Sequence, residues 1–233
     1  MKLSERNVLF RLYYQQKEED QMAILSSLFS MALIFFRILY TGRLMFVFLV
    51  WNLFLGFIPL ALSKCINVKS VAKAGWLFFV VMIIWLLFIP NAFYIITDLF
   101  HLNMNSIMPL WFDLVLILSF AWTGMLMGII SVRRMEALFE QHFNRKFDLL
   151  FIIPVMVLNA TGIYFGRYLR FNSWDVFTNP FVLVGETVDL FVHPLRNRVD
   201  WSMICCYSFF LTLVYVTIKR LSGLFAKAVS IEP

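Results

Sequence analysis

The apolar run GWLFFVVMIIWLLFIP at residues 75–90 carries no charged side chain, and five further runs of similar composition lie along the chain. A run of about 18 or more apolar residues is typical of a helix that crosses a membrane. The chain is 61% hydrophobic and 15% charged, whereas soluble domains are roughly 45–50% apolar and about 25% charged. Alternating strand patterns are absent, so the backbone must be satisfied within helices. We therefore predict an integral membrane protein.

The fold class that these runs predict is an all-α polytopic membrane helix bundle with about six transmembrane helices. The spans are expected near residues 22–40, 44–62, 74–90 and somewhat beyond, 109–132, 147–168 and 201–218. We expect residues 1–21 to form a cytoplasmic N-terminal segment, residues 22–220 the transmembrane domain, and residues 221–233 a cytoplasmic tail. The first 21 residues lack the apolar core of a cleavable signal peptide, so the first span is expected to be an uncleaved anchor.

Lysine and arginine are distributed unevenly between the loops that this topology places on opposite sides. With the N-terminus inside, the outer side holds Arg37, Arg43, Arg167, Arg170, Arg196 and Arg198, and the other 14 of the 20 basic residues lie inside. Because cytoplasmic loops are enriched in Lys and Arg, both termini are expected in the cytoplasm. The formal net charge of +6 then reflects attraction to an anionic inner leaflet, and no nucleic-acid partner is inferred.

The stretch FIPNAFYIITDLFHLN at residues 88–103 brings polar groups to the outer end of the third span. Pro90 predicts a kink in that helix, because proline removes a backbone hydrogen bond. At about 100° per residue, one arc of roughly 80° holds Asn91, Tyr94, Asp98, His101 and Asn105, with Thr97 beside it. This stripe is either a polar wall facing a site between helices or a face turned to interfacial water. Asp98 and His101 are the candidate acid–base pair.

A second polar stretch, GIYFGRYLRFNSWDVFTNP at residues 162–180, supplies complementary charge. If the fifth span continues as a helix, Arg167, Arg170 and Trp174 share one side. Arg–carboxylate pairs are strong when they are bidentate and poorly hydrated, so we predict that Asp98 pairs with Arg167 or Arg170. The alternative is that both arginines extend to outer headgroups. Helix starts are expected at Asn172 or Ser173 with Asp175 in the first turn, and at Asn179–Pro180.

These segments, together with WFDLVLILSFAWTG at residues 111–124, resemble an uncharacterised bacterial integral-membrane family, domain of unknown function 1361. The resemblance covers roughly residues 75–180, with Phe93 where a smaller residue or proline is expected. It rests on Pro90, Asn91, Tyr94, Thr97, Asp98, His101, Asp113, Gly162, Tyr164, Gly166, Arg167, Arg170, Asn172, Ser173, Trp174 and Asp175. It implies a bacterial inner-membrane protein, and it implies no activity.

The segment FVLVGETVDLFVHP at residues 181–194 has two interpretations. Glu186, Asp189 and His193 share a helix face and, with Asp98, His101 and Asp113, include the ligand types of zinc, manganese or iron sites. We favour an interfacial helix between spans five and six, with the three residues as its wet face, and we assign no metal site. Elsewhere, Asn52 and Asn159 are predicted to form interhelical hydrogen bonds, and Gly124 and Gly128 to allow close helix packing.

Three functions remain open from the sequence. The first is binding of an anionic lipid headgroup or lipid-linked ligand at the outer face, with Arg37 and Arg43 as further basic groups. Its ligand-binding residues would be Asn91, Tyr94, Asp113, Arg167, Arg170, Asn172, Trp174 and Asp175. The second is a membrane-embedded acyl or phosphoryl transferase or hydrolase that uses Asp98 and His101 catalytically. The third is a non-catalytic subunit of a membrane complex or a small transporter. No cofactor is identified, and membrane lipids and a membrane-protein partner are the expected partners.

Overall fold

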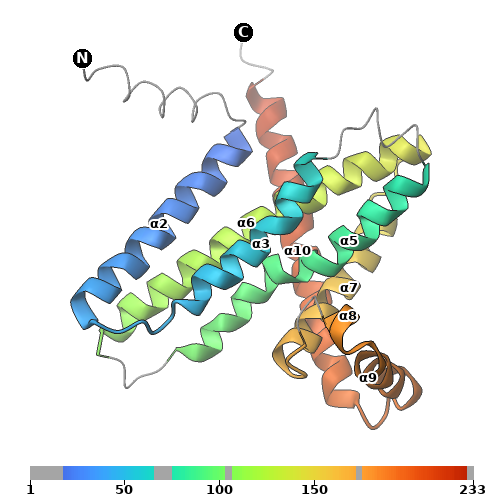
Figure 1. The fold of residues 1–233 in the computed structure, drawn as a ribbon. Helices are drawn as coiled ribbons and strands as arrows, with labels where there is room; N and C mark the ends of the chain where they lie inside the picture. Colours follow the sequence, from blue (N-terminus) through green and yellow to red (C-terminus); the bar gives the residue numbers. More distant parts are fainter. Residues whose placement is uncertain (1–17, 66–74, 103–106, 172–174, 230–233) are drawn as a thin grey trace. The chain divides into compact units, whose positions relative to one another are not determined.

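The computed structural model describes residues 18–65, 75–102, 107–171 and 175–229, and these residues form helices joined by short turns (Figure 1). In chain order the helices are α2 (Glu18–Thr41), α3 (Phe48–Cys65), α5 (Gly75–Tyr94), the 3₁₀ helix η1 (Ile95–His101), α6 (Leu110–Phe143), α7 (Leu149–Arg167), α8 (Asp175–Thr178), α9 (Pro180–Val192) and α10 (Arg198–Val229). The described residues contain no strand. The predicted all-helical membrane fold is confirmed, including a separate helix, α9, between the last two spans.

Five helical segments are long and apolar enough to cross a membrane, namely α2, α5 with η1, α6, α7 and α10. The second of the six predicted spans corresponds to the shorter apolar helix α3, whose part Phe48–Lys64 falls just below the length of these five. Helix α3 has 18 residues and rises about 27 Å, somewhat less than the roughly 30 Å hydrocarbon core. It begins at Phe48 rather than near residue 44, because residues 44–47 form turns in which Phe46 has a positive φ of 70°.

The third span changes from α-helix to 3₁₀ helix a few residues after Pro90. Helix α5 continues through Pro90 to Tyr94, and the chain then tightens into the 3₁₀ helix η1. The prediction of one α-helical stripe from residue 91 onward is therefore wrong beyond Tyr94, and Asn105 lies outside the described residues. Within η1, Thr97 and Asp98 are buried while His101 is exposed, so neighbouring members of the expected stripe have different surroundings.

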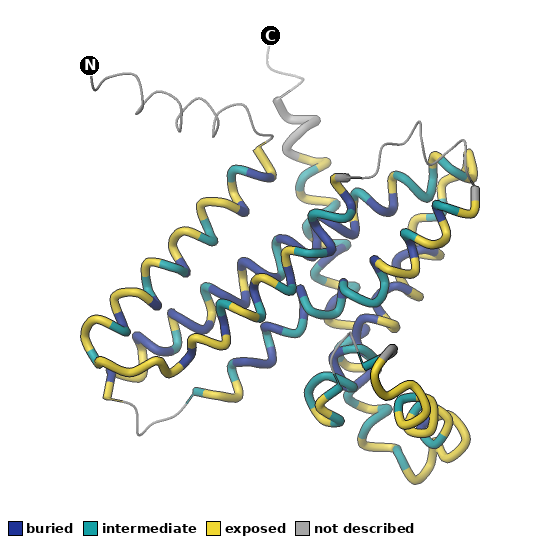
Figure 2. The backbone as a smooth tube through the Cα atoms, viewed as in Figure 1, coloured by how far each residue is buried: buried dark blue, intermediate teal, exposed yellow. Residues whose placement is uncertain are grey.

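The described chain divides into two compact units, which are considered separately below. Unit 1 comprises the described residues within 1–61 and 91–131, and unit 2 comprises the described residues within 62–90 and 132–233. The core of unit 1 contains apolar residues of α2, α3, η1 and α6, among them Leu49, Ile95, Leu116 and Phe120. Helix α6 is the most buried of the five spans: 67% of its most apolar window is buried, against 22% for α2 and α10 (Figure 2). Exposed apolar side chains on α2 and α10 are suited to contact with lipid.

In unit 2, helices α7 and α10 pack against each other along much of their length. At one end, Phe78, Phe139, His142, Phe147 and Phe151 form a chain of ring contacts, with His142 stacked on Phe78 at a centroid distance of 4.3 Å. Towards the other end, Gly162 of α7 lies directly against the ring of Pro90, where a Cβ atom would come within 2.5 Å of the proline Cγ. These contacts run along α5 and α7 in the same chain direction, so the two helices are parallel.

The predicted role of Gly124 and Gly128 in close helix packing is confirmed within unit 1. A Cβ atom on Gly124 would lie 2.6 Å from the Ala92 carbonyl oxygen and 2.7 Å from Ile95 Cδ1. A Cβ atom on Gly128 would lie 2.8 Å from the Phe93 ring. Helix α6 therefore approaches the end of α5 and the start of η1 at a distance that only glycine allows.

We expect Gly124→Ala to destabilise the protein by about 1–3 kcal/mol, because the added methyl group meets backbone and must push the segment away. Gly223→Ala is the matched control, since nothing lies within 4 Å of its Cβ position in α10 and alanine favours a helix by roughly 0.5–1 kcal/mol. Denaturant titration in mixed micelles measures both changes. Equal stability of the two variants would contradict the close approach.

Candidate functional site

A buried ion pair joins α2 to the start of α6 in unit 1. Arg37 donates from Nε to Asp113 Oδ1 at 2.8 Å and from Nη2 to Asp113 Oδ2 at 3.3 Å. The two side chains are 2% and 0% exposed. The Phe46 ring lies 4.6 Å from the guanidinium carbon, and the Met45 carbonyl accepts a further bond at 3.5 Å. Arg37 is thus neutralised by Asp113, so it is unsuited to the predicted role of holding an external anion.

A second polar contact lies at the same end of unit 1. Asn52 of α3 donates from Nδ2 to Asp98 Oδ2 at 2.8 Å, which confirms the predicted interhelical bond of Asn52. Asp98 is 1% exposed, and the interpretation that it faces interfacial water is therefore wrong. His101 is exposed, and its ring packs edge-on against Phe48 at 5.0 Å.

The remaining predicted residues of this stretch and of the later one have varied surroundings. Asn91 and Tyr94, in the last turn of α5, are half-buried. Asn172, Ser173 and Trp174 lie outside the described residues, and Asp175 is the first residue of α8. The predicted start at Asn179–Pro180 is confirmed, with proline in the first turn of α9.

The two arginines at the end of α7 do not lie on one continuous helix. Helix α7 ends at Arg167, and Arg170 follows it in the left-handed region with φ 58°. The Phe171 N–H bonds to the Phe165 carbonyl oxygen at 3.0 Å, which turns the chain back over the last turn of the helix. The prediction that helix continuation aligns Arg167, Arg170 and Trp174 is therefore wrong. Arg170 is exposed, and it forms no ion pair among the residues that the structure describes.

The predicted pairing of Asp98 with Arg167 or Arg170 stays a prediction. Asp98 belongs to unit 1 and the arginines belong to unit 2. Within its own unit, Asp98 accepts a hydrogen bond from Asn52. In unit 2, Arg167 lies close enough to Tyr207 to interact electrostatically with it, and Tyr168 stacks on Tyr164.

The predicted wet face of α9 contains an ion-pair cluster around Asp189. Its Oδ1 lies 3.0 Å from His193 Nδ1 and 3.6 Å from Arg196 Nη1, and Asn197 donates to Oδ2 at 3.2 Å. The hydrogen bond from Asn197 and the positive charge of Arg196 lower the pKa of the Asp189 carboxyl from its ordinary value of 3.8. Asp189 and His193 bind each other, with the arginine alongside, in an arrangement that stabilises the start of the α9–α10 connection.

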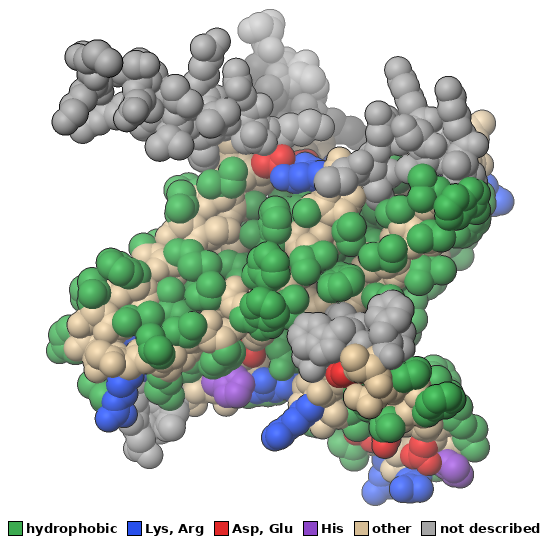
Figure 3. Space-filling view, viewed as in Figure 1, with side chains coloured by type: hydrophobic (Ala, Val, Ile, Leu, Met, Phe, Trp, Pro, Cys, Tyr) green, Lys and Arg blue, Asp and Glu red, His purple; other side chains and the backbone are tan. Residues whose placement is uncertain are grey.

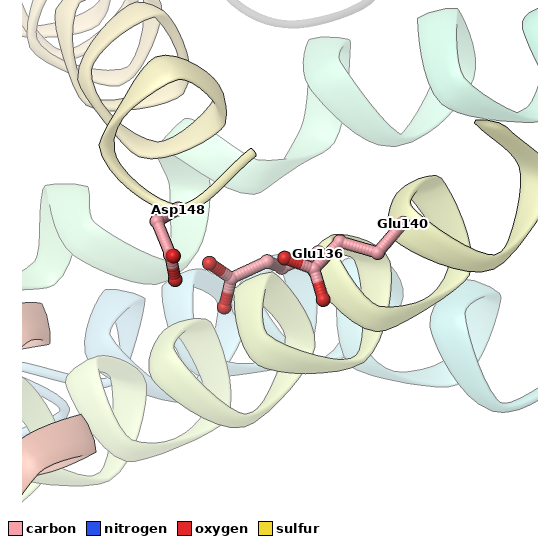
Figure 4. A group of neighbouring side chains, drawn as sticks. All are labelled: Glu136, Glu140 and Asp148. Carbon is pink, nitrogen blue, oxygen red and sulfur yellow. The ribbon is translucent and has the colours of Figure 1, made fainter. Parts of the chain in front are cut away.

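Sequence reasoning missed a network at the opposite end of unit 2. Buried Glu136 accepts from Tyr215 OH at 2.6 Å and from Lys219 Nζ at 2.8 Å, and the same ammonium lies 3.1 Å from Asp148 Oδ1. Glu140 is the third carboxylate of a group whose ligand atoms lie within 4.8 Å of one another (Figure 4). Lys219 supplies a positive charge between two of the three carboxylates. A cavity of about 340 Å³, which includes Glu140 in its lining, opens nearby.

Asn159 departs from its predicted role. Its Nδ2 donates to the Val155 carbonyl of its own helix at 2.9 Å, and its buried Oδ1 has no hydrogen-bond partner. The expected interhelical bond is therefore absent for this residue among the described parts of the chain. An amide oxygen without a partner is expensive inside a membrane bundle.

Together, the apolar helices and the paired charges within them define a multi-pass helical membrane protein. More specifically, the chain belongs to the family described as a protein of unknown function, DUF1361, which matches residues 51–214. The resemblance inferred from the sequence is confirmed over more than two thirds of the chain. The matched range includes Asp98, His101, Arg167 and Arg170 but not Arg37. No match is found among curated proteins or among solved structures.

We expect Arg37→Ala to destabilise the protein by about 3–5 kcal/mol, because it leaves the Asp113 carboxylate buried without its counter-charge. Arg43→Ala is the control, since Arg43 is an exposed arginine in the connection that follows α2. Thermal unfolding in detergent gives the comparison. A double variant, Arg37→Leu with Asp113→Leu, should be less destabilised than Arg37→Ala, and the opposite order would show that the pair is not the source of the effect.

The Asp189 cluster predicts a dependence on acid pH. A carboxyl whose pKa is lowered in the folded state stabilises the fold above its unfolded pKa, and this contribution is lost as pH falls through the lowered value. The stability difference between the wild type and Asp189→Asn should be constant near neutral pH and should close as pH falls below 3.8. Amide hydrogen exchange over residues 189–201 at a series of pH values measures it. A difference that persists at the lowest pH would contradict the assignment.

Proposed function

We propose that the protein binds an anionic lipid headgroup, or the phosphate of a lipid-linked ligand, at the end of α7, with Arg167 and Arg170 as the binding groups. Guanidinium groups match phosphate oxygens in bidentate geometry. From the distribution of Lys and Arg we expect this end to face the extracytoplasmic side. The proposal agrees with the class of membrane protein described above and extends it to a ligand.

The observation that carries the proposal is the backbone of Arg170. Its φ of 58° is a conformation that glycine adopts freely, but that costs an L-residue about 1 kcal/mol or more. The turn after α7 uses this backbone conformation but does not require an arginine, so an exposed arginine in place of glycine points to use of the guanidinium group. By contrast, the guanidinium group of Arg37 already forms an ion pair with Asp113.

The helix dipole indicates which groups at the end of α7 can attract an anion. The C-terminus of a helix carries a partial negative charge, which repels anions. The backbone of α7 therefore contributes nothing to anion binding at this end, and the arginine side chains must supply the attraction. Tyr168, exposed and stacked on Tyr164 at 5.7 Å, offers a phenol of the kind found at membrane interfaces.

Catalysis by Asp98 and His101 has less support. A catalytic base must contact its substrate, whereas Asp98 is 1% exposed and accepts a hydrogen bond from Asn52. We therefore propose that Asp98 has a structural role, in which it holds η1 against α3 within unit 1. A transporter or subunit role has no supporting feature among the described residues.

Arg170→Gly provides the test, because glycine removes the guanidinium group and also relieves the backbone. We expect the variant to be as stable as the wild type or up to about 1 kcal/mol more stable. Binding of phosphatidylglycerol to delipidated protein, followed by native mass spectrometry, should fall about tenfold, which corresponds to about 1.4 kcal/mol. Binding of phosphatidylcholine should change much less.

Arg220→Ala is the matched control for charge. It removes an exposed arginine in the C-terminal half of α10. This residue belongs to the same unit as Arg170. Phosphatidylglycerol binding that falls equally in both variants would show a non-specific effect of net charge. Unchanged binding in Arg170→Gly would refute the proposed site.

A further inference from the structure

Side chains of α10 and of the segment before it fix the rotation of α9 in unit 2. Leu190 is buried in a cluster with Ala160, Tyr164 and Ile204. Trp201 Nε1 donates to the Leu190 carbonyl oxygen at 3.0 Å, and Asn197 Nδ2 donates to the Asp189 carbonyl oxygen at 2.9 Å. The bond from Trp201 gives a partner to a carbonyl group in the last turn of α9, where a helix leaves such groups unpaired, and the Asp189 carbonyl also accepts from the His193 N–H at 3.0 Å. Each face of α9 therefore has a defined direction relative to α7 and α10.

The side of α9 opposite the buried Leu190 is apolar and exposed. We call it the α9 apolar face, and it consists of Phe181, Val184, Val188, Phe191 and Val192, whose exposed fractions are 90%, 59%, 52%, 59% and 62%. At about 100° per residue these side chains lie within an arc of about 100°, centred roughly 150° from Leu190. No charged residue falls within this arc. Phe191 contacts Trp201 of α10 at the edge of this face, and the rest of the face points away from the buried side of the helix.

The charged residues of the same helix occupy a different arc. Glu186, Asp189 and His193 lie within about 60° of one another on a helix, and the last two form the ion-pair cluster with Arg196. In Figure 3 hydrophobic side chains cover part of the α9 region, and acidic, basic and histidine side chains gather at another part of it. Helix α9 therefore has three sides, which are packed, apolar and charged.

We propose that the α9 apolar face inserts into the lipid of the membrane surface, so that α9 lies half-embedded beside α7 and α10. This proposal is independent of the anion-binding function proposed for the end of α7. The arrangement of an apolar face and a charged face on one helix is that of an interfacial helix. A contiguous exposed apolar face in water would favour aggregation.

The occupant is lipid rather than another protein because the apolar face continues a surface that already faces lipid. Only residues 193–197 separate α9 from the membrane span of α10. On that span Phe209 and Leu213 are exposed at 74% and 54%. Arg196 and Arg198 flank the connection, and Trp201 packs on Phe191 with ring centroids 5.2 Å apart. Arginine and tryptophan are the side chains that mark the level of the lipid headgroups.

The experiment uses single-cysteine variants of the full chain in which Cys65, Cys205 and Cys206 are replaced by serine. A fluorescent label is attached at Val188→Cys on the apolar face, or at Glu186→Cys about 160° away on the charged face. The proteins are reconstituted into phosphatidylcholine vesicles whose acyl chains carry bromine, a quencher confined to lipid. Leu213→Cys and Arg145→Cys serve as lipid-exposed and water-exposed references.

We expect bromolipid to quench the label at residue 188 at least twofold more than the label at residue 186, and iodide in the buffer to give the reverse order. Quenching of both labels by iodide alone would show that α9 stands in water and would overturn the proposal. Protection of residue 188 from both quenchers would show that a second copy or a partner protein covers the face, and it would overturn the proposal equally. The anion-binding assay on Arg170→Gly is unaffected by either result.

Discussion

Hydrocarbon offers no water to a charged side chain, and this constraint decides the structure around Arg37. An arginine in a membrane helix is tolerated when a counter-charge and hydrogen-bond acceptors surround it, and here Asp113, the Met45 carbonyl and the Phe46 ring do so. The loop after α2 must fold back to bring Met45 and Phe46 to the guanidinium group. The positive φ of Phe46 costs about 1–2 kcal/mol, whereas a hydrogen bond to a charged group contributes roughly 1.5–3 kcal/mol. The strained turn is therefore the cheaper arrangement, and α3 starts late as a result.

The same constraint operates on the acidic side chains and on the backbone. Glu136 is buried within the long helix α6, where Tyr215 and Lys219 of α10 satisfy both its oxygens. In η1 the backbone leaves α-helical geometry, and the Thr97 hydroxyl donates to the Tyr94 carbonyl at 2.7 Å. Asn159 is the exception among the described residues, because its amide oxygen lacks a partner. The buried charged side chains Arg37 and Glu136 are thus paired with residues that are distant in sequence, whereas Thr97 is satisfied locally.

The parts of the fold that the sequence predicts are those set by local composition. Apolar runs locate the spans because a helix in lipid needs a fixed length of apolar residues, and Asn179–Pro180 marks the start of α9 because proline suits the first turn. The late start of α3 could not be predicted, since it depends on Arg37 meeting a carboxylate 76 positions away. The 3₁₀ geometry of η1 likewise reflects packing, because Ile95 and Ala92 must lie against Gly124.

The residues of the candidate site were likewise predictable only in part from the sequence. The sequence identifies Asp98 and Arg170 as unusual, but Asn52 as the partner of Asp98 is a tertiary contact across 46 positions. The left-handed backbone of Arg170 contradicts the helix continuation that periodicity suggests. Glu136 was missed because the charged run RRMEALFEQH resembles the end of a span. A longer helix could have been inferred from the spacing of four between Glu136 and Glu140. This spacing places both carboxylates on one helix face that continues past residue 132.

The two proposals made for unit 2 are tested separately, but they concern neighbouring parts of one structure. Leu169, next to Arg170, packs on the cluster that also buries Leu190 of α9, so the turn at the end of α7 and the docked side of α9 form one structure. If the α9 apolar face lies in lipid, the opposite, packed side of the helix lies towards the bundle at the level of the headgroups. Arg170 would then stand at the depth where phosphate groups are concentrated. An anionic headgroup that diffuses laterally within the membrane can meet the Arg170 guanidinium group at this depth. A soluble anion would first have to be transferred from water to the headgroup layer.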